Sequence, residues 1–161
     1  MTVSKLTCKM IKYFSDRRFV EHALKVYSYA YTIAELEGIK GDELLTIQCA
    51  AILHDIGIPN AIKIHGSGKG PFQEKEGALL VPEFAGLADI PEALIPKITW
   101  LVGNHHTHEK SGEDILLQIL MEADYLVNLS ESPDRYKLDD VKDFFKTKTG
   151  KEYLSCLFFN V

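Results

Sequence analysis

The chain has 161 residues, 46% of them hydrophobic and 25% charged, which suits one domain with its own hydrophobic core. Its formal net charge of −5 argues against binding to a nucleic-acid duplex, and no apolar run approaches the ~18 residues that span a bilayer. No signal peptide is recognised and the three cysteines form no closely spaced pair, so we expect a cytoplasmic protein with no membrane association and no cysteine metal site.

Helical periodicity runs through nearly the whole chain, and no segment alternates with the two-residue period of a strand. Pro96 falls within one apolar helical pattern and should distort or split that helix. Residues 58–71 form the longest stretch predicted to be irregular, and residues 146–161 are either a docked tail or a partner-facing segment. We therefore predict an all-α single domain over residues 1–161 with six or seven helices. The predicted helices cover residues 4–14, 18–37, 42–56, 73–86, 91–103, 112–129 and 138–147.

Asp124 is an acidic residue in the apolar face of a predicted helix. It lies four residues after Leu120 and three before Val127, so its side chain points in the same direction as theirs. A lone buried carboxylate costs several kcal/mol unless it is paired or binds a metal ion. Asp124 is therefore a candidate ligand. The full apolar face comprises Leu116, Ile119, Leu120, Ala123 and Val127.

Two other helices direct ligand-type side chains toward the interior. His22 lies between Phe19 and Val26 in the apolar face of its helix, and His54 and Asp55 follow an apolar run at the end of another. Adjacent residues on a helix point ~100° apart, so His54 and Asp55 can share one ion only if it lies between them at a packed helix end. Helix bundles assemble metal sites from side chains on facing helices. The simplest explanation for these inward-directed side chains is therefore that all of them bind one metal ion.

Two imidazoles and two carboxylates form a mixed nitrogen and oxygen site. Such a site suits one divalent ion such as Mn, Fe, Co, Ni or Zn, and Mg less well. Four protein ligands leave two positions of an octahedral ion open for water or substrate, as a catalytic site requires. A water on such an ion has a lowered pKa and is a nucleophile at neutral pH, while the ion polarises a phosphoryl oxygen.

The order of these motifs resembles the HD-domain superfamily of metal-dependent phosphohydrolases. Residues 18–26 (RFVEHALKV) resemble its first helix, residues 50–57 (AAILHDIG) are similar to its signature, and residues 122–124 (EAD) resemble its closing motif. Each motif alone is weak, but the ordered set on apolar helices is specific. We expect an HD-type core over about residues 17–129, followed by a C-terminal helix and tail over residues 130–161.

The resemblance implies a helical bundle whose metal ligands are His22, His54, Asp55 and Asp124. It also implies hydrolysis of a small phosphate ester, often a nucleotide or a second messenger. In that reaction Asp55 would both bind the ion and orient the attacking water. The oligomeric state is left open, with a homodimer as one alternative.

Some positions depart from the pattern of the family. Two-metal members carry a further histidine four residues before a glycine–alanine pair, where this chain has Gln73 before Gly77. Members that degrade cyclic dinucleotides continue the signature with lysine and carry a Gly-Tyr-Pro motif, and small nucleotidases carry a glutamate just beyond the signature. This chain has Ile58 there and no Gly-Tyr-Pro. The departures favour one tightly held ion, with a second ion at His105 or His106 as the alternative.

Further residues are candidates for contact with a substrate. His105 and His106 either belong to a polar loop or face the site as catalytic groups that bind phosphate, order water or donate a proton. Arg18 lies on the same helix face as the first histidine and either clamps a substrate phosphate or forms a surface salt bridge. Lys63 or Lys69, near the sequence GSGKG, would reach a phosphate if that loop acts as a lid.

The leading hypothesis from the sequence is an enzyme, namely a mononuclear metal-dependent phosphohydrolase. One alternative is a metal-containing regulatory or sensor domain that binds a nucleotide without turnover, which Ile58 and Gln73 favour slightly. Another is a diiron oxygenase of the same superfamily. Gln73 argues against the oxygenase, because oxygen chemistry there requires both irons.

Overall fold

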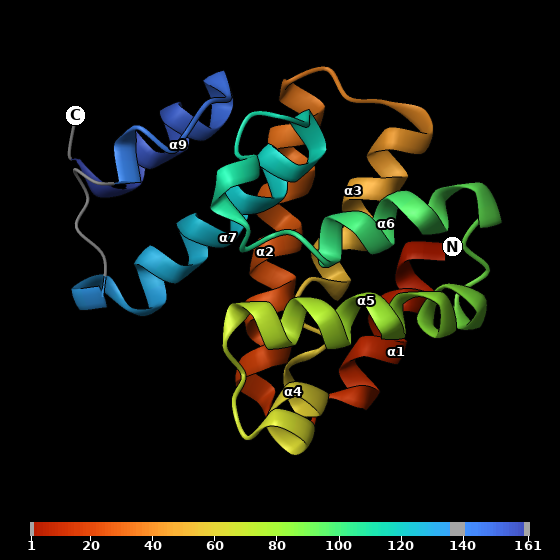
Figure 1. Ribbon diagram of the computed structural model, residues 1–161. Helices are drawn as coiled ribbons and strands as arrows, with labels where there is room; N and C mark the ends of the chain where they lie inside the picture. Colours follow the sequence, from red (N-terminus) through yellow and green to blue (C-terminus); the bar gives the residue numbers. More distant parts are fainter. Residues whose placement is uncertain (1, 136–140, 160–161) are drawn as a thin grey trace.

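The computed structural model describes residues 2–135 and 141–159. Within these residues eight α-helices and three short 3-10 helices form the fold, and no strand is found among them (Figure 1). The prediction of an all-α fold is therefore confirmed. The α-helices are α1 (Thr2–Tyr13), α2 (Arg17–Leu36), α3 (Gly41–Leu53), α4 (Ile58–His65), α5 (Gly70–Leu87), α6 (Ile95–Val102), α7 (Ile115–Glu131) and α9 (Lys148–Phe158). The 3-10 helices are η1 (Glu92–Leu94), η2 (His108–Lys110) and η3 (Pro133–Arg135).

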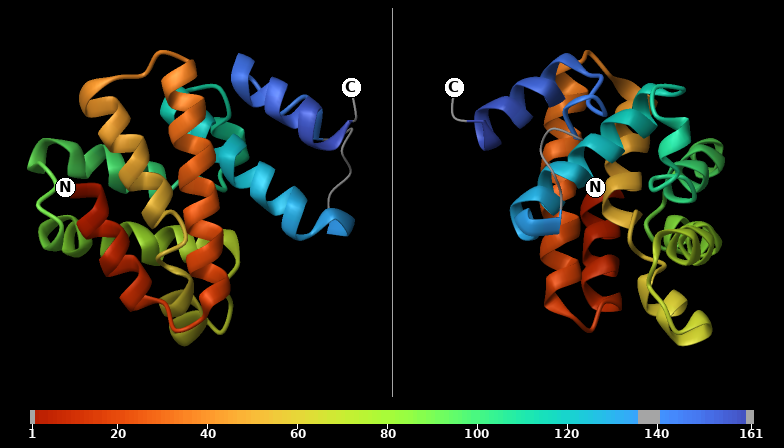
Figure 2. Two further views of the ribbon diagram at one scale, coloured as in Figure 1. Left: turned by 180° about the vertical axis from the view of Figure 1, so that it is seen from behind. Right: turned by 60° about the vertical axis from the view of Figure 1, so that its left-hand side comes forward.

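The long helix α2 packs against both α3 and α7 and runs along most of the height of the molecule in Figure 1. Helices α5 and α6 lie side by side across one face of this arrangement, and α6 contacts α3. Helix α1 packs against α3 and α5, while α9 lies against α7 and α2, as the two views of Figure 2 show. Helix α3 is thus enclosed by α1, α2, α6 and α7.

The sequence of α3 explains its central position. Residues 49–53 are all completely buried, and a helix with apolar side chains on every side must be surrounded by other elements. Each buried Ile or Leu side chain contributes about 1.5–3 kcal/mol to stability. The apolar run ends at His54 and Asp55, so the burial of α3 carries these two residues into the interior.

No helix among residues 2–135 and 141–159 is by itself long and apolar enough to cross a membrane. Only α3 and α4 taken together reach that length and composition, and they are bent by 44° relative to each other. The apolar side chains of α3 pack inside the bundle.

Most of the predicted helices are confirmed, with ends shifted by a few residues. Asp16 and Asp114 cap the N-termini of α2 and α7, because their carboxylates accept hydrogen bonds from backbone amides of the first turn. Pro96 does split its helix: η1 comes first, and Pro96 lies in the first turn of the following α6. At that position the N–H that proline lacks would have no acceptor within the helix.

The prediction that residues 58–71 are irregular is wrong for the first part of that stretch, where α4 forms. Pro59 soon after Gly57 is typical of a helix end, but here the proline lies in the first turn of a new helix. Gly66 ends α4 in the left-handed conformation, with a φ of 68°. Only a few residues then separate α4 from α5.

The predicted helix over residues 138–147 is described only in part. Residues 138–140 lie outside the described part of the chain, Val141 and Lys142 are helical, and residues 143–147 form a turn and non-helical chain. The last helix, α9, begins only at Lys148, because the Thr147 side chain caps its N-terminus. Helix α9 is therefore an additional helix beyond the predicted range.

The C-terminal segment is docked on the bundle. The completely buried carboxylate of Glu122 in α7 accepts hydrogen bonds from the amides of Lys146 at 2.6 Å and Thr147 at 3.0 Å. Glu37, just beyond α2, accepts from the amide of Thr149 at 2.7 Å. Of the two alternatives for the tail, the docked one is correct for its described residues.

Candidate metal centre

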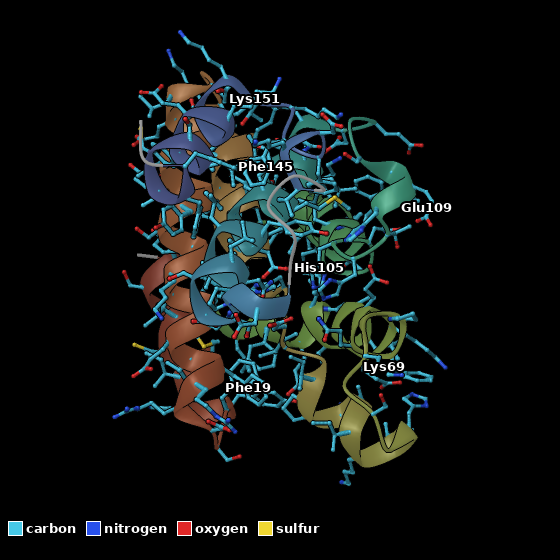
Figure 3. The ribbon with its side chains drawn as sticks, turned by 90° about the vertical axis from the view of Figure 1, so that its left-hand side faces the viewer. Phe19, Lys69, His105, Glu109, Phe145 and Lys151 are labelled. Atoms are coloured by element: carbon cyan, nitrogen blue, oxygen red, sulfur yellow. The ribbon has the colours of Figure 1, made fainter. Side chains whose placement is uncertain are left out.

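Four side chains from three parts of the fold meet in one buried region. His22 comes from the second turn of α2, His54 and Asp55 from the turn that follows α3, and Asp124 from α7. Each residue is at most 8% exposed. Figure 3 shows this region around His105, between α7 and the start of α5. The packing of α2 against α3 and α7 brings the four side chains together.

The donor atoms of these four side chains lie close together. His22 Nε2 lies 3.0 Å from Asp124 Oδ1 and 3.6 Å from Asp55 Oδ2. His54 Nε2 lies 3.4 Å from Asp55 Oδ2 and 3.7 Å from Asp124 Oδ1. Ligands at about 2.0–2.2 Å from an ion and about 90° apart are separated by about 3 Å, so these atoms are close to the spacing that one ion requires.

One nitrogen of His54 has no partner in this region. Nδ1 of the ring donates a hydrogen bond to the carbonyl oxygen of Ala51 at 2.8 Å, so in the neutral ring Nε2 carries the lone pair. This Nε2 is buried and has no hydrogen-bond partner among the described residues. Leaving such an atom unsatisfied costs about 1–3 kcal/mol, whereas coordination to a metal ion would satisfy it. The residues present therefore fit a divalent ion.

Two neighbouring residues hold the ligand-type side chains in place. Glu131 Oε2 accepts a hydrogen bond from His22 Nδ1 at 2.9 Å, which leaves His22 Nε2 directed at the centre. Asn128 Nδ2 donates to Asp124 Oδ1 at 2.8 Å. Sequence reasoning missed both residues, although they follow Asp124 by seven and four positions and so share its helix face.

The charges of the metal-free centre also suit a cation. Burial lowers the pKa of His22, but the hydrogen bond to Asp124 and the charge of Asp55 raise it overall to about 9. Burial likewise opposes ionisation of the two acids, yet His54 beside Asp55 and His22 beside Asp124 hold both carboxyl pKa values below their usual range. Both acids are therefore anionic at neutral pH, and a proton on His22 compensates part of their charge.

The other oxygen of Asp55 faces a second group of side chains. Asp55 Oδ1 accepts a hydrogen bond from Gln73 Nε2 at 2.7 Å and lies 3.6 Å from His105 Nε2. His105 is almost completely buried, and its Nδ1 donates to the carbonyl oxygen of Val102 at 2.7 Å. His106 Nε2 lies 2.5 Å from Gln73 Nε2. Asp55, His105 and His106 are close enough together to hold an ion of their own.

The pKa values of the two histidines of this second group are shifted in opposite directions. Burial lowers the pKa of His105, but its interaction with the Asp55 carboxylate raises that pKa above the ordinary value. Burial and the neighbouring His105 lower the pKa of His106 to about 4, so His106 is neutral at pH 7. His106 can therefore form hydrogen bonds with a ligand but cannot neutralise its charge.

Close packing of the turn after α3 against α5 places Gln73 beside Asp55. A side-chain carbon added at Gly57 would overlap the carbonyl oxygen of Gln73 and lie 2.9 Å from Gly77 Cα. A side-chain carbon at Gly77 would in turn lie 2.9 Å from Val102 Cγ1. Glycine at both positions allows this turn, α5 and α6 to approach one another closely.

A cavity of about 780 Å³ opens beside the centre. Arg18 lines it, although its side chain is largely exposed and pairs with Asp16 at 2.7 Å. Lys69, which is labelled in Figure 3, also lines the cavity and belongs to the segment before α5. Lys63 lies on the exposed side of α4 and is not among the lining residues. The lining includes His22, Asp55, Gln73, His105, His106 and Asp124.

The family model of the HD domain matches residues 19–129, which is more than half of the chain. This chain belongs to the HD-domain family. HD domains bind divalent metal ions, and both groups of histidine and aspartate side chains in this HD domain have the spacing to hold one. The matched residues contain the four ligand-type side chains, whose metal ligation stays a prediction. No curated protein and no solved structure gives a significant match to the chain.

Replacing Glu131 with alanine should weaken metal binding by this HD domain without unfolding it. The substitution removes the acceptor of the His22 Nδ1 hydrogen, so the ring is freer to rotate or change tautomer. The expected loss of affinity is about 10–100-fold, which calorimetric titration with Mn²⁺ measures. Lys25→Ala is the control. It removes the partner of the other Glu131 oxygen, at 3.0 Å, and leaves the acceptor of the His22 hydrogen in place. Equal affinities of the wild type and Glu131→Ala would contradict the role given to Glu131.

The stability of the metal-free HD domain should fall as the pH rises from 6.5 to about 9. The pKa of His22 is about 9 in the folded protein and ordinarily 6.5, so the folded state holds this proton more tightly than the unfolded state. The resulting stabilisation, at most about 3 kcal/mol, is fully present below pH 6.5 and lost as the pH rises through the folded pKa. Urea unfolding in the presence of a chelator measures it. The variant His22→Gln should lack this decline, and an equal decline in both proteins would refute the assignment.

Proposed function

We propose that this HD domain is a metal-dependent phosphohydrolase that cleaves a small phosphate ester such as a nucleotide. The observation that carries the proposal is the buried, unpartnered Nε2 of His54, which lies beside Asp55 and Asp124, two residues that line a cavity of about 780 Å³. A structural ion is closed off by its protein ligands, whereas this centre borders a space large enough for a small ligand.

A divalent ion held by the four ligand-type side chains would polarise a phosphoryl oxygen and lower the pKa of a neighbouring water. The protein contributes the positioning of these side chains. Gln73 and Asn128 donate hydrogen bonds to Asp55 Oδ1 and Asp124 Oδ1, at 2.7 and 2.8 Å, and so fix the orientation of both carboxylates. Burial of the carboxylates keeps solvent from competing for their charge.

Positive side chains near the cavity would bind the phosphate. Arg18 and Lys69 both line the cavity and are exposed. The Arg18 guanidinium now forms two hydrogen bonds with Asp16 Oδ2, at 3.1 and 2.7 Å, and a phosphate can replace this partner with the same forked geometry. His106 is neutral and would add a hydrogen bond. Lys63 has no part in this proposal, because it does not line the cavity.

A regulatory domain that binds a nucleotide without turnover is the alternative. The observation in its favour is the amide of Gln73, which binds Asp55 Oδ1 and so occupies one side of a carboxylate that would otherwise orient water. This alternative predicts tight binding of a nucleotide and no product.

Phosphate release from a panel of nucleotides and phosphate monoesters tests the proposal. Each compound is incubated with the protein and Mn²⁺, Co²⁺, Ni²⁺ or Mg²⁺, or with a chelator, and Asp55→Ala is measured beside the wild type. We expect release that requires a metal ion and is lost in Asp55→Ala. Calorimetric binding of a nucleotide without any release would favour the regulatory alternative. Release that persists in the chelator would contradict metal dependence.

A further inference from the structure

Gln73 lies at the centre of the second group of side chains. It belongs to the first turn of α5 and is only 4% exposed. Its amide nitrogen lies 2.7 Å from Asp55 Oδ1, 2.5 Å from His106 Nε2 and 3.2 Å from His105 Nε2. The three residues that surround this nitrogen are the ones that lie close enough together to hold an ion.

Asp55 Oδ1 and ring nitrogens of His105 and His106 surround the amide nitrogen, and an ion bound here would need all three as ligands. The Asp55 carboxylate can only accept, which places the nitrogen of the Gln73 amide, and not its oxygen, on this side. His105 uses Nδ1 to donate to Val102, so in the neutral ring Nε2 carries a lone pair. A side-chain amide has two hydrogens, and Asp55 Oδ1 and His106 Nε2 are the nearer two of the three atoms. The buried Asp55 carboxylate attracts positive charge to this group, since it raises the pKa of His105.

We propose that the side-chain amide of Gln73 takes the place of a second metal ion and restricts this centre to one ion. The amide nitrogen is within hydrogen-bond distance of all three side chains, where an ion shared by them would lie. Its hydrogens carry partial positive charge, so the amide holds these side chains together without a cation. This inference rests on the metal centre of the proposed function but does not depend on hydrolysis.

The orientation of Asp55 follows from the same contact. Because Gln73 holds Oδ1, the other oxygen, Oδ2, faces His22 at 3.6 Å and His54 at 3.4 Å. A carboxylate that bridges two ions through both of its oxygens has none left to accept a hydrogen bond in the plane of an amide. Asp55 instead divides its oxygens between one metal position and one amide, which makes Gln73 a positioning residue for the first ion as well.

Two substitutions distinguish the effect of the hydrogen-bond donors of the amide from the effect of its volume. Gln73→Glu keeps the shape but adds a carboxylate to a group of acceptors, where a cation restores the balance of charge. Gln73→Ala removes the amide and leaves both space and unsatisfied acceptors. Gln48→Glu and Gln48→Ala are matched controls, because Gln48 in α3 donates to Tyr27 at 3.3 Å and does not line the cavity.

The experiment measures metal content, so it does not depend on activity. Each protein is saturated with Mn²⁺, separated from unbound ion by gel filtration, and analysed for Mn²⁺ per chain by mass spectrometry. EPR spectroscopy then distinguishes an isolated ion from a pair coupled through a shared carboxylate. We expect one ion per chain in the wild type and both Gln48 variants, and two in Gln73→Glu and Gln73→Ala.

Two ions in the wild type would overturn the inference. A single ion in both Gln73 variants would also overturn it, provided that their melting temperatures show that they are folded. If Gln73→Ala does not fold, Gln73→Glu decides alone, since it preserves the shape of the side chain. One ion in the wild type without phosphate release contradicts only the phosphohydrolase, whereas metal-dependent release with two ions contradicts only the role of Gln73. Absence of any bound ion contradicts both.

Discussion

Gly57→Ala is expected to destabilise the domain by at least about 3 kcal/mol, because the added methyl group has no space. The new carbon would overlap the carbonyl oxygen of Gln73 and the amide nitrogen of Gly77, and these backbone atoms cannot rotate away. Relief requires α5 to move away from the turn after α3, which separates Gln73 from Asp55. We therefore expect a lower midpoint of urea unfolding, together with weaker metal binding by the molecules that remain folded.

Two other glycines serve as controls for this substitution. At Gly86 an added carbon meets nothing within 4 Å, so Gly86→Ala should raise stability by about 0.5–1 kcal/mol through its effect on the helix. Gly77→Ala meets Val102 Cγ1 at 2.9 Å, a side-chain atom that can shift, so its effect should be intermediate. A Gly57→Ala protein as stable as the wild type would contradict the close packing of this turn against α5.

The candidate ligands could be predicted from the sequence because a polar residue in an apolar helix face is visible in the helical spacing. Asp124 and His22 both have this property, and His54 with Asp55 follows a run that is too apolar for the surface. The spacing does not give distances between helices. Those depend on how α2 packs against α3 and α7, which involves residues far apart in the chain.

Helices α4 and α9 were not predicted, for two different reasons. α4 is short, exposes Ile62 and Ile64, and has a proline in its first turn, a residue that is also typical of the positions after a helix. The placement of α9 depends on Glu122, whose buried carboxylate binds a segment more than twenty positions later. Gln73 is a similar case: the sequence shows that a histidine is absent there, but only the fold shows which acceptors its amide contacts.

Asp55→Ala is expected to abolish tight metal binding and activity while the fold is retained. Both oxygens are involved, since Oδ2 faces His22 and His54 and Oδ1 binds Gln73. Loss of a direct ligand should reduce metal affinity by more than the about 10–100-fold that loss of a supporting residue costs. The repulsion between the Asp55 and Asp124 carboxylates disappears at the same time. The free energy of unfolding of the metal-free protein should therefore change by less than about 2 kcal/mol.

Metal affinity, phosphate release and urea unfolding of the same preparation separate these effects of Asp55→Ala. Asp42→Ala is the control, because Asp42 is an exposed acid in the first turn of α3 and does not line the cavity. Wild-type activity in a folded Asp55→Ala protein that has lost its metal would place the chemistry elsewhere. Loss of activity with metal binding intact would assign Asp55 to the orientation of water or substrate, since His22, His54 and Asp124 would then suffice to hold the ion.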